Sequence, residues 1–249
     1  MNIIPQRSYS RAADEIRPCH FRLGAAANAH GSALVTFGST KVLCTATIDR
    51  EVPRFQNDKG QGWLTAEYGM LPCATSVRNS REHTMNNGRT KEIQRLIGRS
   101  LRAGLDLSAL AGYRIIADCD VLQADGGTRT ASVCGAWLAV VQACSTLHGS
   151  GSLQQWPVSQ QIAAISVGRC RDEVMVDLDY SEDSLAQVDS NVVMNHRGEF
   201  IEIQSTAERT AFSRAQLDLM LNYAQKAITR IMELQRAALA DSGLTWQPD

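Results

Sequence analysis

The sequence lacks the features of secreted, membrane-spanning or metal-stapled proteins. Residues 1–11 contain no apolar stretch long enough for a secretory signal. The longest nearly apolar run, around residues 135–141, is far too short to cross a bilayer. The seven cysteines are scattered, odd in number and never spaced as CxxC, which argues against a disulfide framework or a zinc site. We therefore expect a cytoplasmic protein without a membrane partner, whose cysteines are mostly small core residues.

A strong net charge is also absent. The chain has 249 residues, 44% of them hydrophobic and 20% charged, and its net charge of −1 argues against general coating of nucleic acid. Charge is nevertheless segregated. Residues 76–103 hold seven basic and two acidic side chains, whereas residues 172–189 hold seven acidic ones and no Lys or Arg. Two unrelated solvated faces would explain this, and so would a basic surface for phosphates beside an acidic cluster for a cation.

Alternation of apolar and polar residues predicts strands that pair as hairpins. The predicted strands are 33–37 with 42–48, 113–122, 162–167 with 174–180, and 192–194 with 200–203.

Helical spacing of apolar residues predicts three longer helices. One begins near Ile93 and has a basic outer stripe. The second, 128–147, is apolar on nearly every side and should be buried. The last begins with Ser213 as N-cap and Gln216 at N3, which is a capping box. This mixture of strands and helices is typical of an α+β layered fold, and we see no internal sequence repeat.

A Gly- and Ser-rich stretch at residues 148–152 is typical of a linker. We predict a single domain over residues 1–249. It is composed of halves at about 11–148 and 158–240, joined by a linker at 149–157.

The segment 125–130, with the sequence DGGTRT, places glycines, a hydroxyl and a guanidinium where a strand turns into the buried helix. Free N–H groups at a helix start favour an anion, and Gly127 lets the main chain approach it closely. Thr128 and Arg129 add a hydroxyl and a planar fork suited to phosphate. A plain capped turn is the alternative, and a Walker loop is excluded because no Gly-Lys-Ser/Thr follows.

Arg89 lies four residues before Ile93 and seven before Leu96, so it falls on the apolar stripe of its helix. We therefore expect its side chain to point inward, where an unpaired guanidinium is costly and needs a partner. A salt bridge to a protein carboxylate is one possibility. A phosphate shared with Thr128 and Arg129 is the other.

The acidic stretch supplies candidate ligands for a hard cation. We expect Asp183 and Asp189 just outside strands, where they serve either a metal or acid/base chemistry. Asp177 and Asp179 are expected on the solvent face of an alternating strand.

Several longer strings resemble signatures of the RNase PH family, and the resemblance to its bacterial members extends from about residue 11 to residue 239. The strings are QGW at 61–63, AEYGMLP at 66–72, GRT at 88–90, EIQRLI at 92–97, DCDVLQADGGTRTAS at 118–132, EDS at 182–184 and NVVM at 191–194.

The resemblance implies two similar βαβ-containing halves with mixed sheets and packed helices, and a homohexameric ring built as a trimer of dimers. It further implies a 3′→5′ exoribonuclease that trims tRNA precursor 3′ ends with inorganic phosphate as co-substrate, releasing nucleoside diphosphates. The implied roles are phosphate binding by Arg89, Gly127, Thr128 and Arg129, catalysis with Mg²⁺ or Mn²⁺ at Asp183 and Asp189, and RNA binding by Arg54, Arg78 and Arg81.

The sequence departs from the family pattern in places that bear on tRNA affinity. Cys73 stands where Arg is usual, Ser190 where Met is usual and Ser205 where Gly is usual, and the loop 83–87 is short. Two other functions fit the same residues. One is a metal-dependent hydrolytic nuclease, and the other is a catalytically silent RNA-binding ring subunit.

Overall fold

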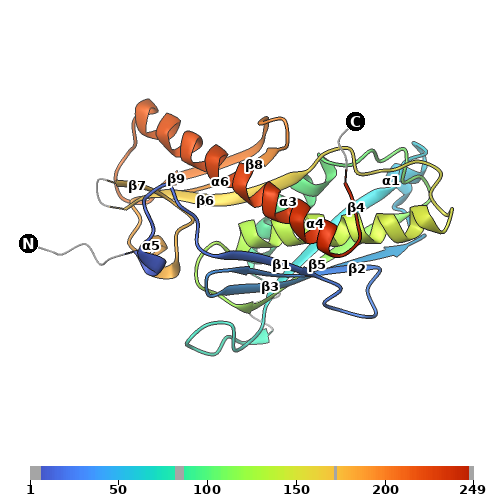
Figure 1. Cartoon of the computed structure of the whole chain (residues 1–249), viewed down its shortest axis with the longest axis horizontal. Coiled ribbons are helices and arrows are strands. Elements are labelled where there is room, and N and C mark those ends of the chain that lie inside the picture. Colours follow the sequence, from blue (N-terminus) through green and yellow to red (C-terminus); the bar gives the residue numbers. More distant parts are fainter. Residues whose placement is uncertain (1–6, 82–86, 171–172, 247–249) are drawn as a thin grey trace, which may run out of the picture.

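The structure is a computed structural model that describes residues 7–81, 87–170 and 173–246. Two β-sheets with helices packed on them form an α+β fold (Figure 1). The first sheet has the strand order β1-β2-β3-β5-β4 and the second β7-β6-β8-β9. The predicted fold class is therefore confirmed. The predicted boundaries of the two halves and the linker stay predictions.

The first sheet is mixed. Its strands are β1 (Cys19–Leu23), β2 (Gly31–Phe37), β3 (Thr40–Asp49), β4 (Trp63–Met70) and β5 (Arg114–Gln123). All neighbours pair antiparallel except β4 and β5, which are parallel. The helix α3 (Gly88–Arg102) makes the crossover between these two, so β4, α3 and β5 form a βαβ unit.

The second sheet is antiparallel between all its described strands. These are β6 (Ile162–Cys170), β7 (Glu173–Val176), β8 (Val188–Asn195) and β9 (Phe200–Ala207). Among the described residues the parallel βαβ unit thus occurs in the first half alone, and what the halves share is a sheet backed by helices. The predicted strand 174–180 is too long. It ends at Val176 because Asp177 has a φ of 56°, and the short helix α5 (Tyr180–Asp183) follows.

Two long helices hold the sheets together. The buried helix α4 (Thr128–Gly149) contacts β2, β3 and β6, and α6 (Arg214–Asp241) contacts β1, β6 and β7. The capping box of Ser213 and Gln216 is present at the start of α6. By length and composition α4 could cross a membrane. However, 78% of its most apolar stretch is buried inside the protein, as in the core helix of a soluble fold.

Two short helical segments, η1 (Ser8–Ser10) and α1 (Arg54–Asn57), complete the described elements. Six of the seven cysteines are buried and Cys73 is exposed, which confirms that most are core residues. Burial raises the pKa of Cys134 and of Cys144 to about 12.

Candidate active site

The turn between β5 and α4 has the conformation that its two glycines allow. Gly126 and Gly127 have φ values of 74° and 65°, a region that disfavours other residues. A Cβ at Gly126 would come within 2.3 Å of the Leu178 carbonyl oxygen, so the turn lies directly against the backbone that follows β7. The Thr40 hydroxyl donates to the Gly126 carbonyl at 2.7 Å and accepts the Asp125 N–H at 3.0 Å. We call residues 125–127 the glycine turn.

The start of α4 faces a cavity next to this turn. Gly127 is the N-cap of α4, and no described side chain caps the helix, which leaves the positive end of its dipole available to an anion. Thr128 is 9% exposed, and its hydroxyl is 2.8 Å from that of Tyr68. Burial raises the pKa of Tyr68, which keeps this phenol protonated. The arrangement is suited to binding an oxyanion.

Arg89 differs from the prediction, because it is exposed. Burial along its helix starts at Thr90 and Ile93, so the first turn of α3 extends beyond the packed layer. The expected inward orientation was therefore wrong. Its side chain lines two cavities instead, and no carboxylate of the described residues lies within salt-bridge distance of it.

Arg129 is held loosely by polar neighbours. Its guanidinium donates to the Gln204 side-chain oxygen at 3.2 Å and lies 3.5 Å from a carboxylate oxygen of Glu92. Gln204 in turn donates to Glu92 at 3.0 Å. The Arg129 side chain is 14% exposed, and Glu92 is half exposed, so an incoming anion would compete with a weak ion pair.

Two cavities, of about 470 and 520 Å³, share part of their walls. The glycine turn and Thr128 line the larger one. The residues common to both are Arg89, Arg129, Asp183, Asp189 and Asn191. The structure thus brings the two predicted phosphate-binding arginines and the two predicted catalytic carboxylates to one place.

Asp183 ends α5, and Asp189 is the second residue of β8, so Asp189 lies within a strand and not just outside one as expected. Burial raises the pKa of both carboxyls, and the charge of Asp183 further raises that of Asp189. Two nearby carboxylates are a donor set that fits Mg²⁺, which binds proteins through one or two carboxylates with water and substrate phosphate. No group of three or more potential ligands occurs among the described residues.

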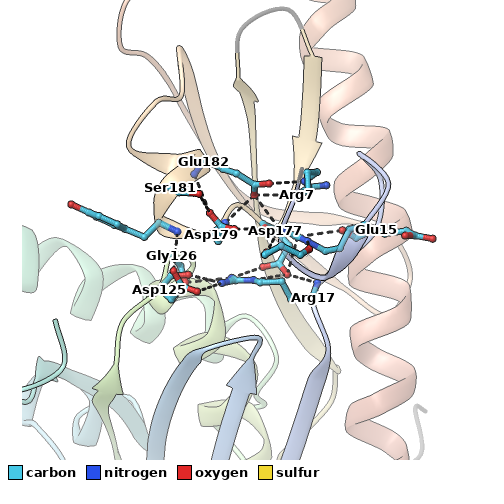
Figure 2. A network of polar contacts seen from close by, with 12 residues as sticks. Arg7, Glu15, Arg17, Asp125, Gly126, Asp177, Asp179, Ser181 and Glu182 are labelled. Carbon is cyan, nitrogen blue, oxygen red and sulfur yellow. Dashed lines mark hydrogen bonds and ion pairs between the residues drawn. The ribbon is translucent and has the colours of Figure 1, made fainter. Parts of the chain in front are cut away.

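Asp177 and Asp179 are buried, contrary to the expectation of a solvent face. They are 1% and 6% exposed and pair with arginines of the segment 7–17 (Figure 2). The chain leaves β7 at Asp177 with a positive φ, and both carboxylates then face the N-terminal segment. These two residues therefore lie behind the cavities and not in them.

The predicted RNA-binding arginines do not lie together. Arg78 and Arg81 are exposed in the segment after β4, near Val77 and Asn79, which line the larger cavity. Arg54 is exposed on α1, which precedes the opposite end of β4 (Figure 1). The eight residues of β4 separate the two regions by roughly 25 Å.

Sequence reasoning missed several residues of the cavity walls. Tyr180 is 67% exposed and Val77 is 77% exposed, and both line the larger cavity. Asn191 is 5% exposed and lines both cavities. The sequence signal for Tyr180 was an aromatic residue within an acidic stretch, whereas Asn191 lies in an apolar strand and carries no charge.

Two of the departures from the family pattern face each other. Ser190 and Ser205 are partners across β8 and β9, and their hydroxyls form a 2.7 Å hydrogen bond. Cys73 is exposed after β4. Of the loop 83–87, residues 83–86 lie outside the described residues, and Asn87 caps α3 by accepting the Thr90 N–H.

These features define a two-sheet protein in which an uncapped helix start and two arginines line cavities beside paired carboxylates. Residues 15–145 match domain 1 of the 3′ exoribonuclease family, RNase PH, and residues 160–227 match domain 2. The chain belongs to the RNase PH family.

Solved structures show the same fold at low sequence identity. An Archaeoglobus fulgidus exosome structure with RNA bound to its active site matches with a TM-score of 0.80 at 19% identity, covering 92% of each chain. An archaeal exosome core matches with a TM-score of 0.73 at 18% identity, covering 90% of this chain and 89% of that one. Rice (Oryza sativa) Rrp46 matches with a TM-score of 0.73 at 18% identity, covering 94% and 100%.

Proposed function

We propose that this protein is a phosphorolytic 3′→5′ exoribonuclease of the bacterial RNase PH type that trims tRNA precursor 3′ ends in the cytoplasm. The observation that carries the proposal is the meeting of Arg89 and Arg129 with Asp183 and Asp189 where the two cavities join. Cations at this junction suit a free phosphate and the scissile phosphodiester, and the carboxylates suit a divalent cation or a proton.

In the proposed reaction an oxygen of inorganic phosphate attacks the last phosphodiester of the RNA. The bond from that phosphorus to the 3′ oxygen of the shortened RNA breaks, and this oxygen takes up a proton. The last nucleotide leaves as a nucleoside diphosphate, and the reverse reaction adds nucleotides. Because the nucleophile is an anion approaching an anion, charge screening by Arg89, Arg129 and the start of α4 is the main task of the protein.

Asp183 and Asp189 would hold Mg²⁺ or Mn²⁺, which supplies charge neutralisation at the phosphodiester when bound. Their carboxyl groups are also placed to hold or deliver a proton, since burial raises the pKa of each. The larger cavity offers the exposed side chains of Val77 and Tyr180 to the RNA bases. Arg78 and Arg81 lie next to this side of the larger cavity and would contact the RNA backbone there. Arg54 lies at the opposite end of β4 and would contact RNA at a separate place.

The surface of the second sheet supports a proposed assembly into a ring. The edge strand β9 exposes Phe200 at 46% and Ile203 at 42%, and α6 exposes Leu219 at 40%. Exposed apolar residues on an edge strand favour a subunit contact. The exosome cores that share the fold support a ring, and we propose a homohexamer arranged as a trimer of dimers.

A short RNA labelled in its last nucleotide tests the reaction. With inorganic phosphate we expect labelled nucleoside diphosphate, and without phosphate we expect intact RNA. Release of monophosphate at the same rate with and without phosphate would establish a hydrolytic nuclease. Tight RNA binding with no release under any metal would establish a silent ring subunit.

A further inference from the structure

Behind the two cavities lies a buried cluster of charges that the proposed chemistry does not use. Figure 2 shows arginines of the N-terminal segment converging on carboxylates of the segment after β7 and on the glycine turn. Arg17 is its most enclosed member, with a fully buried side chain, and its partner Asp177 is 1% exposed.

Arg17 uses most of its donors on Asp177. Its Nε donates to one carboxylate oxygen at 3.0 Å and its Nη2 to the other at 2.7 Å, which is a bidentate pair. The backbone N–H of Arg17 donates to the same carboxylate at 2.7 Å. Asp177 is therefore neutralised, and the guanidinium is held in one orientation.

The remaining donors of Arg17 reach the glycine turn. Nη1 donates to the Asp125 carbonyl at 2.5 Å, and Nη2 lies 3.4 Å from the Gly126 carbonyl. The Gly126 carbonyl also accepts the Thr40 hydroxyl. Arg17 and Thr40 thus hold two consecutive carbonyls of the turn in place on the side away from the cavity. This arrangement directs the N–H groups that follow towards the cavity.

The same turn contacts the carboxylate side of the site. The Asp125 side chain accepts the N–H of Tyr180 at 3.3 Å, and Tyr180 is the first residue of α5, the helix that ends at Asp183. A continuous series of contacts therefore connects the end of β7 to the glycine turn and the glycine turn to α5. Its members are Asp177, Arg17, Asp125 and Tyr180.

A buried ion pair gains little net stability over apolar packing, because desolvation offsets the attraction between its charges. The Arg17–Asp177 ion pair is better explained by the geometry that it imposes on the site. The proposed phosphate-binding residues and the carboxylates belong to different halves of the chain. A displacement of an ångström between reacting groups lowers the reaction rate substantially. Arg17 lies at the joint between these halves.

We propose that Arg17, oriented by Asp177, is a positioning residue that sets the glycine turn, and with it bound phosphate, relative to Asp183. This inference rests on the proposed function, because it takes inorganic phosphate as the ligand of the turn. It predicts that loosening Arg17 impairs phosphate binding selectively.

The test compares Arg17→Lys with Thr40→Val, which removes the other hydrogen bond to the same carbonyl. Lysine keeps the charge but has three donors on a single nitrogen, so it cannot reproduce the bidentate pair with Asp177 together with both contacts to the turn. One matched control is Arg114→Lys, because Arg114 begins β5, at the end away from the glycine turn, and forms a bidentate pair with Asp49 of β3. The other is Ser100→Ala, which removes a buried hydroxyl bonded within α3.

Two readouts are measured on the full chain. One is the Kd for inorganic phosphate by calorimetry in the absence of RNA, and the other is the pair of KM values for phosphate and RNA. We expect both turn variants to raise the phosphate Kd and KM by roughly tenfold or more, with the RNA KM changed less than about twofold. The controls should leave all three values at the wild-type level.

A lower melting temperature for Arg17→Lys with an unchanged phosphate Kd would overturn the proposal, since that result describes a merely structural ion pair. If Arg17→Lys does not fold, Thr40→Val decides: an unchanged phosphate Kd refutes positioning through the turn. Failure of the proposed function looks different, because then the wild-type protein itself would bind no phosphate and would degrade RNA without it.

Discussion

Two pairs of arginines in this protein have opposite surroundings. Arg11 and Arg17 are buried, and their donors are occupied by carboxylates and carbonyls of the chain. Arg89 is exposed on a cavity wall, and Arg129 has a weak ion pair and an amide oxygen. The buried pair shapes the backbone, whereas the cavity pair has donors to spare for a ligand. The two pairs thus differ in how many of their hydrogen bonds the protein has already made.

Asp177→Asn should have the largest effect, and on stability. The amide keeps the shape and tolerates the positive φ, but the buried Arg17 loses its closest counter-ion and keeps the more distant Asp125 carboxylate at 3.9 Å. We expect a loss of about 3–5 kcal/mol in the free energy of unfolding by urea titration. A loss below about 1 kcal/mol would show that solvent reaches this cluster and would remove the contrast between the two pairs.

Arg129→Ala and Arg89→Ala should lower activity and leave stability nearly unchanged. We expect kcat/KM for phosphate to fall about a hundredfold or more, the scale of losing one preorganised charge donor, while the urea midpoint changes little. RNA binding should persist, because other basic residues contact the backbone. Arg95→Ala is the control, since Arg95 is exposed on α3 and lines neither cavity. Equal losses of RNA affinity and rate would mean that Arg89 and Arg129 hold RNA.

Asp189→Asn should have a smaller effect on stability, and one that depends on pH. Burial raises the pKa of Asp189, so the folded protein retains a proton that the unfolded chain releases. The protonated Asp189 therefore contributes stability to the fold. This contribution is fully present below the pKa of the residue in the unfolded chain, near 3.9, and is lost as the pH rises through its pKa in the folded protein. The variant should therefore gain stability over the wild type at neutral pH, and the gain should vanish near pH 4 in urea titrations.

Turnover by Asp189→Asn separates its two possible roles. If Asp189 chiefly binds metal, raising Mg²⁺ or Mn²⁺ should partly restore the rate, because mass action offsets weaker affinity. If it is chiefly the general acid, added metal should not help. Normal turnover at low metal concentration would exclude both roles.

Arg214→Ala should have the smallest effect. Arg214 pairs with Asp218 one helical turn away on α6, and both side chains are well exposed. We expect a change within about 0.5 kcal/mol in the urea titration and no change in either KM. A larger effect would show that this end of α6 is covered in the assembled protein.

Local patterns predicted much of the fold and part of the site. The glycine turn, the buried α4 and the capping box of α6 depend on neighbouring residues, so composition and spacing revealed them. The burial of Asp177 could not be read in this way, because its partner Arg17 is 160 residues away in the chain. Arg89 was misplaced for a related reason: periodicity gives the face of a helix but not where the packed layer ends.

The distribution of thiols makes the protein ready for site-specific labelling. Cys73 is the one exposed cysteine of seven, and it lies in the segment that leads from β4 to Val77 on the cavity wall. The other six thiols are buried and therefore react poorly, and burial raises the pKa of Cys134 and of Cys144 to about 12. A maleimide dye would therefore attach at a single natural position near the cavity, where its fluorescence would report a ligand that enters the cavity without any substitution in the chain.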